Sequence, residues 1–193
     1  MRFSVLLFLL ISSVCLKAQP QLDRYEDAVY RDNIKSVQFH VNGLALTQPV
    51  ATLGSMNSLF LSFDVLDGDG TRYYYTVIHC DRHWQPTREL SQFDYLNGFR
   101  EGEIRDYEMS SGTYQNYLYY YVTLPNDEVK WNISGNYLLV VYESGNEDDP
   151  VMTRRFMVTE EQVKIKADVV RPVIVELQNT HQEIDFSVQI DKL

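Results

Sequence analysis

The chain has 193 residues, of which 45% are hydrophobic and 23% are charged, a composition typical of a globular protein. Its 27 acidic and 17 basic side chains give a net charge of −10, which argues against binding to nucleic acid or to an anionic membrane surface. Tyrosine is abundant, with 14 residues, and Tyr-rich sequences favour β-sheets. The composition therefore excludes a coiled coil and a transmembrane helix bundle.

Residues 1–18 have the features of an export signal. Arg2 gives a positive start, and residues 3–14 form a mostly apolar stretch that is too short to span a bilayer of about 30 Å. Ala18 is a small residue that suits cleavage before Gln19. We therefore predict a cleaved signal peptide and an exported protein.

The predicted cleavage changes both the charge and the cysteine content. It removes Arg2 and Lys17 and no acidic residue, so 15 basic and 27 acidic residues leave a net charge of −12. Of the two cysteines only Cys80 remains, so an intrachain disulfide is impossible.

Alternating apolar residues predict short strands along most of the chain. The predicted strands are residues 35–41, 58–65, 72–79, 104–109, 117–124, 136–142 and 153–159. The turn at residues 67–70 predicts a hairpin between the second and third of them. Residues 136–142 are apolar on both faces, which predicts a central strand. This pattern predicts an all-β fold, an antiparallel immunoglobulin- or fibronectin-like β-sandwich.

Residues 80–116 contain only the weak strand at 104–109 and form a long loop for a compact domain. We predict an ordered excursion with a short helix near residues 89–95. Its aromatic residues Trp84, Tyr95 and Phe99 are expected to pack against the sandwich.

The chain changes in character after residue 160. We predict an N-terminal lead-in at residues 19–33, the sandwich domain at 34–160, and a linker with the incomplete start of a second β-domain at 161–193. Residues 173–177 and 184–190 are expected to form a hairpin-like pair, which cannot make an independent core.

Two arrangements near the third strand suggest chemistry, and neither is well supported. His79 and His83 are four residues apart and could bind zinc from one helix face, but Pro86 argues against a helix there. Cys80 with a histidine could form a nucleophile and base, but a buried thiol is far more common. We therefore predict no catalytic residue, no metal site and no cofactor.

Two other segments admit alternative interpretations. Residues 67–70 look like a calcium loop but lack the ligand spacing of an EF-hand, and a turn explains them. The Tyr-rich segment 117–121 could form a platform for sugar or peptide, or it could simply pack within a sheet.

A series of short motifs runs through residues 25–160. They are His79-Cys80-Asp81, Trp84-Gln85-Pro86, Tyr95-Leu96-Asn97-Gly98-Phe99, Ile104, Asp106-Tyr107, Leu124-Pro125-Asn126, Ser134-Gly135-Asn136-Tyr137 and Arg155-Phe156-Met157-Val158. In this order, the set resembles the N-terminal domain of the type IX secretion system plug proteins of Bacteroidota.

The resemblance implies a non-enzymatic periplasmic protein that seals the periplasmic mouth of the large outer-membrane translocon barrel. The barrel would be its partner and would associate it with the outer membrane, with no nucleic acid, no small-molecule substrate and no direct membrane insertion. The resemblance also gives structural or interface candidates: Cys80, Asp81, Trp84, Pro86, Tyr95, Leu96, Gly98, Phe99, Pro125, Asn126, Ser134, Gly135, Asn136 and Tyr137. The alternative is an exported carbohydrate-binding or adhesin-like β-sandwich module.

Overall fold

The structure, a computed structural model, describes residues 25–190 apart from Asn57, Asp67 and residues 145–146. The predicted signal peptide at residues 1–18 and the predicted new N-terminus, Gln19, lie outside the described residues.

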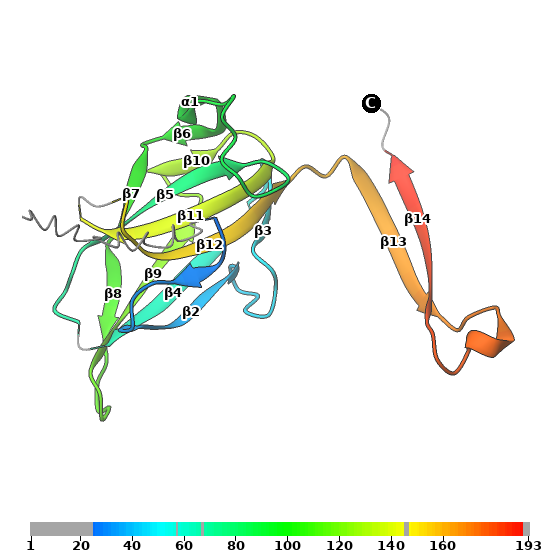
Figure 1. The fold of residues 1–193 in the computed structure, drawn as a ribbon, viewed down its shortest axis with the longest axis horizontal. Coiled ribbons are helices and arrows are strands. Elements are labelled where there is room, and N and C mark those ends of the chain that lie inside the picture. Colours follow the sequence, from blue (N-terminus) through cyan, green and yellow to red (C-terminus); the bar gives the residue numbers. More distant parts are fainter. Residues whose placement is uncertain (1–24, 57, 67, 145–146, 191–193) are drawn as a thin grey trace, which may run out of the picture.

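Two β-sheets pack face to face in a sandwich (Figure 1). The six-stranded sheet has the order β1-β12-β11-β5-β7, with β3 beside β12, and the four-stranded sheet has the order β2-β4-β9-β8. The strands of the first sheet are β1 (Ala28–Val29), β3 (Val50–Thr52), β5 (Tyr73–Cys80), β7 (Glu101–Ile104), β11 (Gly135–Glu143) and β12 (Pro150–Thr159). Those of the second are β2 (Ile34–Val41), β4 (Leu59–Leu66), β8 (Asp106–Met109) and β9 (Tyr117–Leu124). Apart from the parallel pair β3–β12, the pairs in these sheets are antiparallel, which confirms the predicted fold class.

The core lies between the two sheets and is rich in aromatic rings. Phe63 of β4, Tyr73 of β5 and Tyr120 of β9 are buried with their ring centroids 5.0–5.5 Å apart. The Tyr120 hydroxyl donates to the backbone carbonyl of Thr71 at 2.9 Å, so its polar end is satisfied. Buried aromatic residues of both sheets therefore hold the layers together.

The prediction that residues 136–142 form a central strand is confirmed. β11 lies between β5 and β12, and its residues Tyr137 to Tyr142 are all buried. On the outer face of this sheet, Cys80, Leu138, Val140 and Tyr142 form a second apolar cluster.

The predicted hairpin between residues 58–65 and 72–79 is wrong. β4 pairs with β2 and β9 in the four-stranded sheet, whereas β5 pairs with β11 and β7 in the other. The connection between them crosses from one sheet to the other. An alternating pattern identifies the buried face of a strand but not its neighbour, because both sheets bury a face in the same core.

The predicted strand at residues 104–109 is two strands in different sheets. β7 pairs with β5, β8 pairs with β9, and Arg105 lies between them at the crossover. The excursion also contains the helix α1 (Gln92–Tyr95), inside the predicted range, and β6 (Leu96–Gly98), which pairs with β10 (Val129–Trp131).

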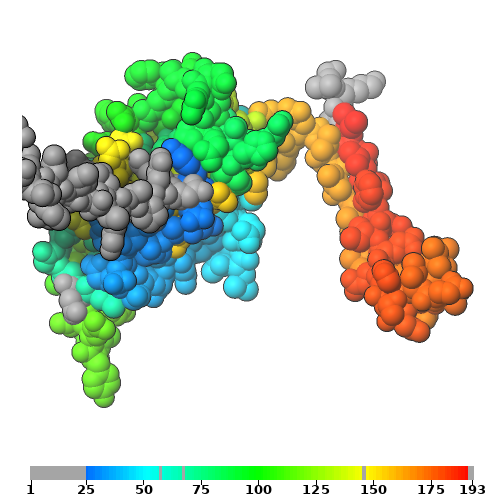
Figure 2. Space-filling view, in the orientation of Figure 1, coloured from blue at the N-terminus to red at the C-terminus, as the bar shows by residue number. Residues whose placement is uncertain are grey.

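Residues 163–190 form a hairpin that extends away from the sandwich (Figures 1 and 2). β13 (Val163–Val170) pairs with β14 (Glu183–Ile190), whereas the predicted strand at 173–177 contains the 3-10 helix η1 (Val175–Leu177) instead. The apolar residues of both strands share one face in the pairing register, and they are exposed. That this segment begins a second β-domain stays a prediction.

Candidate functional site

The carboxylate of Asp81 organises the turn that follows β5. It accepts hydrogen bonds from the backbone N–H groups of His83 at 2.7 Å and Gln85 at 3.0 Å. These bonds, chiefly the one from Gln85, lower the pKa of Asp81. The side-chain amide of Asn136 donates to the backbone carbonyl of Asp81 at 3.0 Å, which ties the turn to the start of β11.

Cys80 and Trp84 lie on the outer face of the six-stranded sheet. Cys80 is 2% exposed, and its burial raises the pKa of the thiol to about 11. The thiol is therefore protonated at neutral pH and is a poor nucleophile. The half-buried Trp84 packs on the same cluster, with the guanidinium carbon of Arg155 4.7 Å from the centroid of its ring.

The two histidines of this region have different surroundings. Nδ1 of His79 lies 2.8 Å from the Thr87 hydroxyl, and its ring packs against Tyr137 at a centroid distance of 5.0 Å. His83 accepts a hydrogen bond from Nε of Arg82 at 2.9 Å. In the described part of the chain, no three His, Cys, Asp or Glu side chains are grouped so that they could hold a metal ion.

Gly98 allows β6 to pair with β10. Its φ of +114° lies in the region that favours glycine, and a Cβ at this position would overlap the carbonyl oxygen of Glu128. The N–H of Phe99 donates to that same oxygen at 2.6 Å. The backbone that carries Phe99 is therefore fixed directly against the turn before β10.

α1 fixes a second phenylalanine nearby. The carboxylate of Asp94 accepts from both the N–H and the hydroxyl of Ser91 at 2.7 Å, which closes the first turn of the helix. Tyr95 is buried at the other end, whereas Phe93 is 87% exposed.

The prediction that Phe99 packs against the sandwich is wrong. Its side chain is 67% exposed, and the core positions of this segment are occupied by Tyr95 and Leu96 instead. The predicted burial of Tyr95 is confirmed. A shallow pocket of about 450 Å³ lies between the two exposed rings and is lined by Gln92, Phe93, Leu96, Gly98, Phe99 and Arg100.

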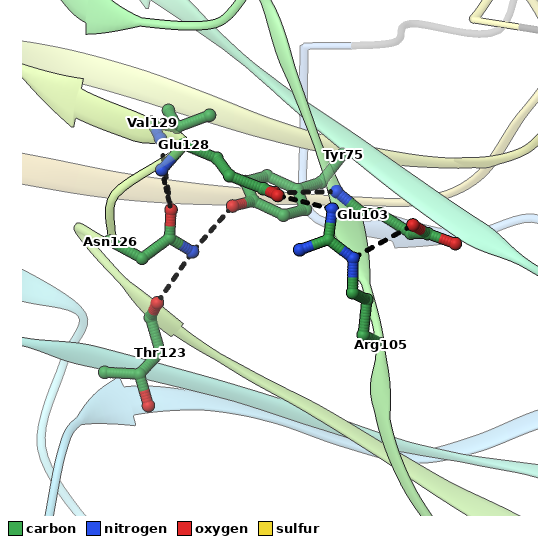
Figure 3. Close-up of polar contacts among 7 residues, drawn as sticks. All are labelled: Tyr75, Glu103, Arg105, Thr123, Asn126, Glu128 and Val129. Atoms are coloured by element: carbon green, nitrogen blue, oxygen red, sulfur yellow. Dashed lines mark hydrogen bonds and ion pairs between the residues drawn. The ribbon is translucent and has the colours of Figure 1, made fainter.

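Asn126 holds the turn that follows β9 (Figure 3). Its side-chain N–H₂ donates to the Tyr75 hydroxyl at 2.7 Å and to the carbonyl of Thr123 at 3.2 Å. Its side-chain oxygen accepts from the N–H groups of Glu128 and Val129, both at 3.0 Å. One amide therefore joins the end of β9, the start of β10 and the core residue Tyr75.

Arg105 connects the crossover between β7 and β8 to the same turn (Figure 3). Its guanidinium lies 2.6 Å from Oε1 of Glu128 and 3.0 Å from Oε2 of Glu103. Oε2 of Glu128 also accepts from the N–H of Glu103 at 3.1 Å. No local pattern indicates this cluster, because isolated charges between short strands are common on any surface.

The residues singled out by the sequence gather at one end of the sandwich, around β6, β10 and the start of β11. We call this region, residues 80–99 and 125–137, the motif end. Several contacts link its segments: the N–H of Asn132 donates to the Tyr95 carbonyl at 2.8 Å, and the Tyr95 and Tyr137 rings lie 6.2 Å apart. The polar side of the motif end consists of Asp81, Ser134 and Asn136, and its exposed apolar side is the pocket between Phe93 and Phe99.

A family model described as "Type 9 secretion system plug protein 1st domain" matches residues 34–160. The chain belongs to this family. The description of this family refers to type IX secretion, which links the chain to that secretion system.

The plug-family chain is also similar to a solved protein of unassigned function. The crystal structure of a hypothetical protein from Parabacteroides merdae is 34% identical, with a TM-score of 0.77. The match covers 86% of this chain and 41% of the other, so the chain spans less than half the length of that protein. A DNA-bound alkylpurine DNA glycosylase, AlkC from Pseudomonas fluorescens, matches 63% of this chain and 30% of its own at 12% identity, and its TM-score of 0.32 carries no argument.

No curated protein matches the chain. Among the described residues, no helix has the length and apolar character needed to cross a bilayer.

Proposed function

We propose that this chain is a non-enzymatic periplasmic plug that seals the periplasmic mouth of the outer-membrane type IX translocon barrel. The observation that carries the proposal is the family match over residues 34–160, which includes every strand of the sandwich from β2 to β12 and leaves out only β1. A cleaved signal peptide at residues 1–18 would deliver the protein to the periplasm, and the barrel would hold it at the outer membrane.

The exposed pair Phe93 and Phe99 is the best candidate for the contact with the barrel. Aromatic side chains are enriched at protein interfaces, and those presented on rigid backbone lose little entropy on binding. Both conditions hold here, since the Ser91–Asp94 hydrogen bonds fix Phe93 and the Glu128 carbonyl fixes Phe99. The two rings border a shallow pocket that a partner side chain could fill.

The charge of the chain suits a reversible seal. A net charge of −10, or −12 without residues 1–18, favours electrostatic attraction to basic surface on the partner. Such attraction weakens as salt screens it, whereas apolar contacts do not. A plug that combines both can bind specifically and still be released.

Affinity purification from detergent-solubilised outer membrane tests the proposed contact. The tagged full chain should recover the barrel, and the double variant Phe93→Ser, Phe99→Ser should recover several-fold less of it. The matched control is Leu46→Ser, which removes a fully exposed apolar side chain from a different loop. Equal recovery of the barrel by all three proteins would show that the two phenylalanines are not part of the interface. Failure of the unaltered chain to recover the barrel would contradict the plug proposal.

A further inference from the structure

The outer face of the four-stranded sheet carries a continuous row of aromatic rings. Consecutive centroids are 5.7 Å apart from His40 to Phe60, 6.0 Å from Phe60 to Tyr121 and 5.7 Å from Tyr121 to Tyr119. The row crosses three neighbouring strands, β2, β4 and β9. In β9 the alternate residues, such as Tyr120, are the ones in the core, so Tyr119 and Tyr121 lie on the outer face, where they and Phe60 are half-buried. His40, at the β2 end of the row, is buried, so the accessible part of the row is Phe60, Tyr121 and Tyr119.

Carboxylates flank this aromatic row. In the strand register Asp106 lies opposite Tyr121, and Glu108 and Asp64 lie opposite Tyr119 from the two sides. Within the described residues, none of these three carboxylates forms a hydrogen bond or an ion pair. Lys35 lies opposite Asp64 in β2, which leaves Asp106 and Glu108 as an excess of negative charge on the face.

A pocket of about 470 Å³ adjoins the row at Tyr121. Its lining includes Tyr121 and four carboxylates: Glu103, Asp106, Asp127 and Glu128. Arg105 neutralises two of them, and Lys130 pairs with Asp127 at 3.0 Å. Of these four carboxylates, Asp106 is the one that has no basic partner among the described residues, and it lies opposite Tyr121 in the strand register.

We propose that this face binds an arginine-containing extended segment of a partner protein, with one guanidinium placed between Tyr121 and Asp106. A planar guanidinium can stack on a tyrosine ring and form two hydrogen bonds to one carboxylate, a combination that the ammonium of lysine cannot make. The neighbouring rings and Glu108 give a second basic residue of the segment a similar environment. This surface is separate from the Phe93–Phe99 pair and goes beyond the proposed plug function.

Fluorescence anisotropy with a labelled ten-residue peptide of alternating Arg and Ser tests this proposal on the full chain at low salt. Asp106→Asn and Tyr121→Ser are each expected to raise the Kd by about threefold or more. Tyr121→Phe keeps the ring, so its Kd should lie within about twofold of that of the unaltered chain. This variant is also the control that shows whether substitution at residue 121 disturbs folding. The corresponding Lys–Ser peptide should bind several-fold more weakly.

Asp185→Asn is the matched control, because it removes one negative charge from the exposed hairpin β13–β14. This variant should leave the Kd unchanged. If it weakens binding as much as Asp106→Asn does, the peptide is attracted only by net charge and the proposal is overturned. Binding of cellohexaose that is lost in Tyr121→Ser would instead identify the row as a sugar platform. Neither result depends on the translocon, so the plug proposal would stand in both cases.

Discussion

The guanidinium carbon of Arg155, in β12, lies 4.7 Å from the centroid of the Trp84 ring, in the loop that follows β5. The ring in turn shields the buried cluster around Cys80 and Leu138. Trp84 therefore covers an apolar cluster on the outer face of the six-stranded sheet and is not part of the core between the two sheets.

This position sets the expected cost of removing the ring. Trp84→Ala should destabilise the protein by about 2 kcal/mol, less than the 3–5 kcal/mol of a fully buried tryptophan, because the ring is half-buried. Urea unfolding followed by circular dichroism measures the difference. A loss below about 0.5 kcal/mol would mean that the ring does not pack on the cluster in solution.

Asn126→Ala should be costly for a residue in a turn. The substitution leaves the N–H groups of Glu128 and Val129 and the hydroxyl of Tyr75 without their partner, at an expected total of about 2–3 kcal/mol. The free energy of unfolding in urea is again the measurement, with Asn42→Ala in an exposed loop as control. Equal effects of the two substitutions would contradict the central position of the Asn126 amide.

Gly98→Ala should disrupt the pairing of β6 with β10. The new Cβ would overlap the Glu128 carbonyl, and the backbone conformation is strained for alanine, so we expect a loss of more than about 2 kcal/mol. Gly112→Ala is the control, since its φ is also positive at +71° but nothing lies within 4 Å of a Cβ there. That substitution should cost only about 1 kcal/mol. Thermal unfolding of the two variants separates strain from overlap, and an equal shift in Tm would argue against the close approach.

The buried thiol of Cys80 gives a pH dependence of stability with a definite sign. Its pKa is raised to about 11 in the folded protein from 9.0, so between these values the folded state holds a proton that the unfolded state has lost. This contribution is fully present below pH 9 and is lost as the pH rises from 9 to 11. Cys80→Ala should therefore show a shallower loss of stability over that range than the unaltered chain. Identical slopes would mean that the thiol is accessible to water.

The sequence predicted the individual strands of this fold but not which strands pair with one another. Alternation identified the strands at residues 58–65 and 117–124, because each strand buries one face in a shared core. It could not show that β4 and β5 belong to different sheets, nor that Arg105 divides one apparent strand into two. These features depend on contacts between distant segments, such as the ion pair of Arg105 with Glu128, to which no local pattern corresponds.

For the candidate site, the motifs identified segments that the fold brings to one end, but not which of their side chains are exposed. Tyr95 and Phe99 are both aromatic residues in the same loop, yet one is buried and the other is exposed. Between them the backbone leaves the helix α1 and passes through the positive φ of Gly98, and no pattern in the sequence specifies this path.

The plug proposal is tested most directly by the permeability of the outer membrane in a strain that lacks this protein. Deletion should let small antibiotics that normally stay outside enter through the unsealed translocon, and expression of the full-length protein should restore the barrier. Expression of the Phe93→Ser, Phe99→Ser variant should restore it less well, if these residues hold the plug in place. Unchanged permeability together with normal secretion in the deletion strain would contradict the account.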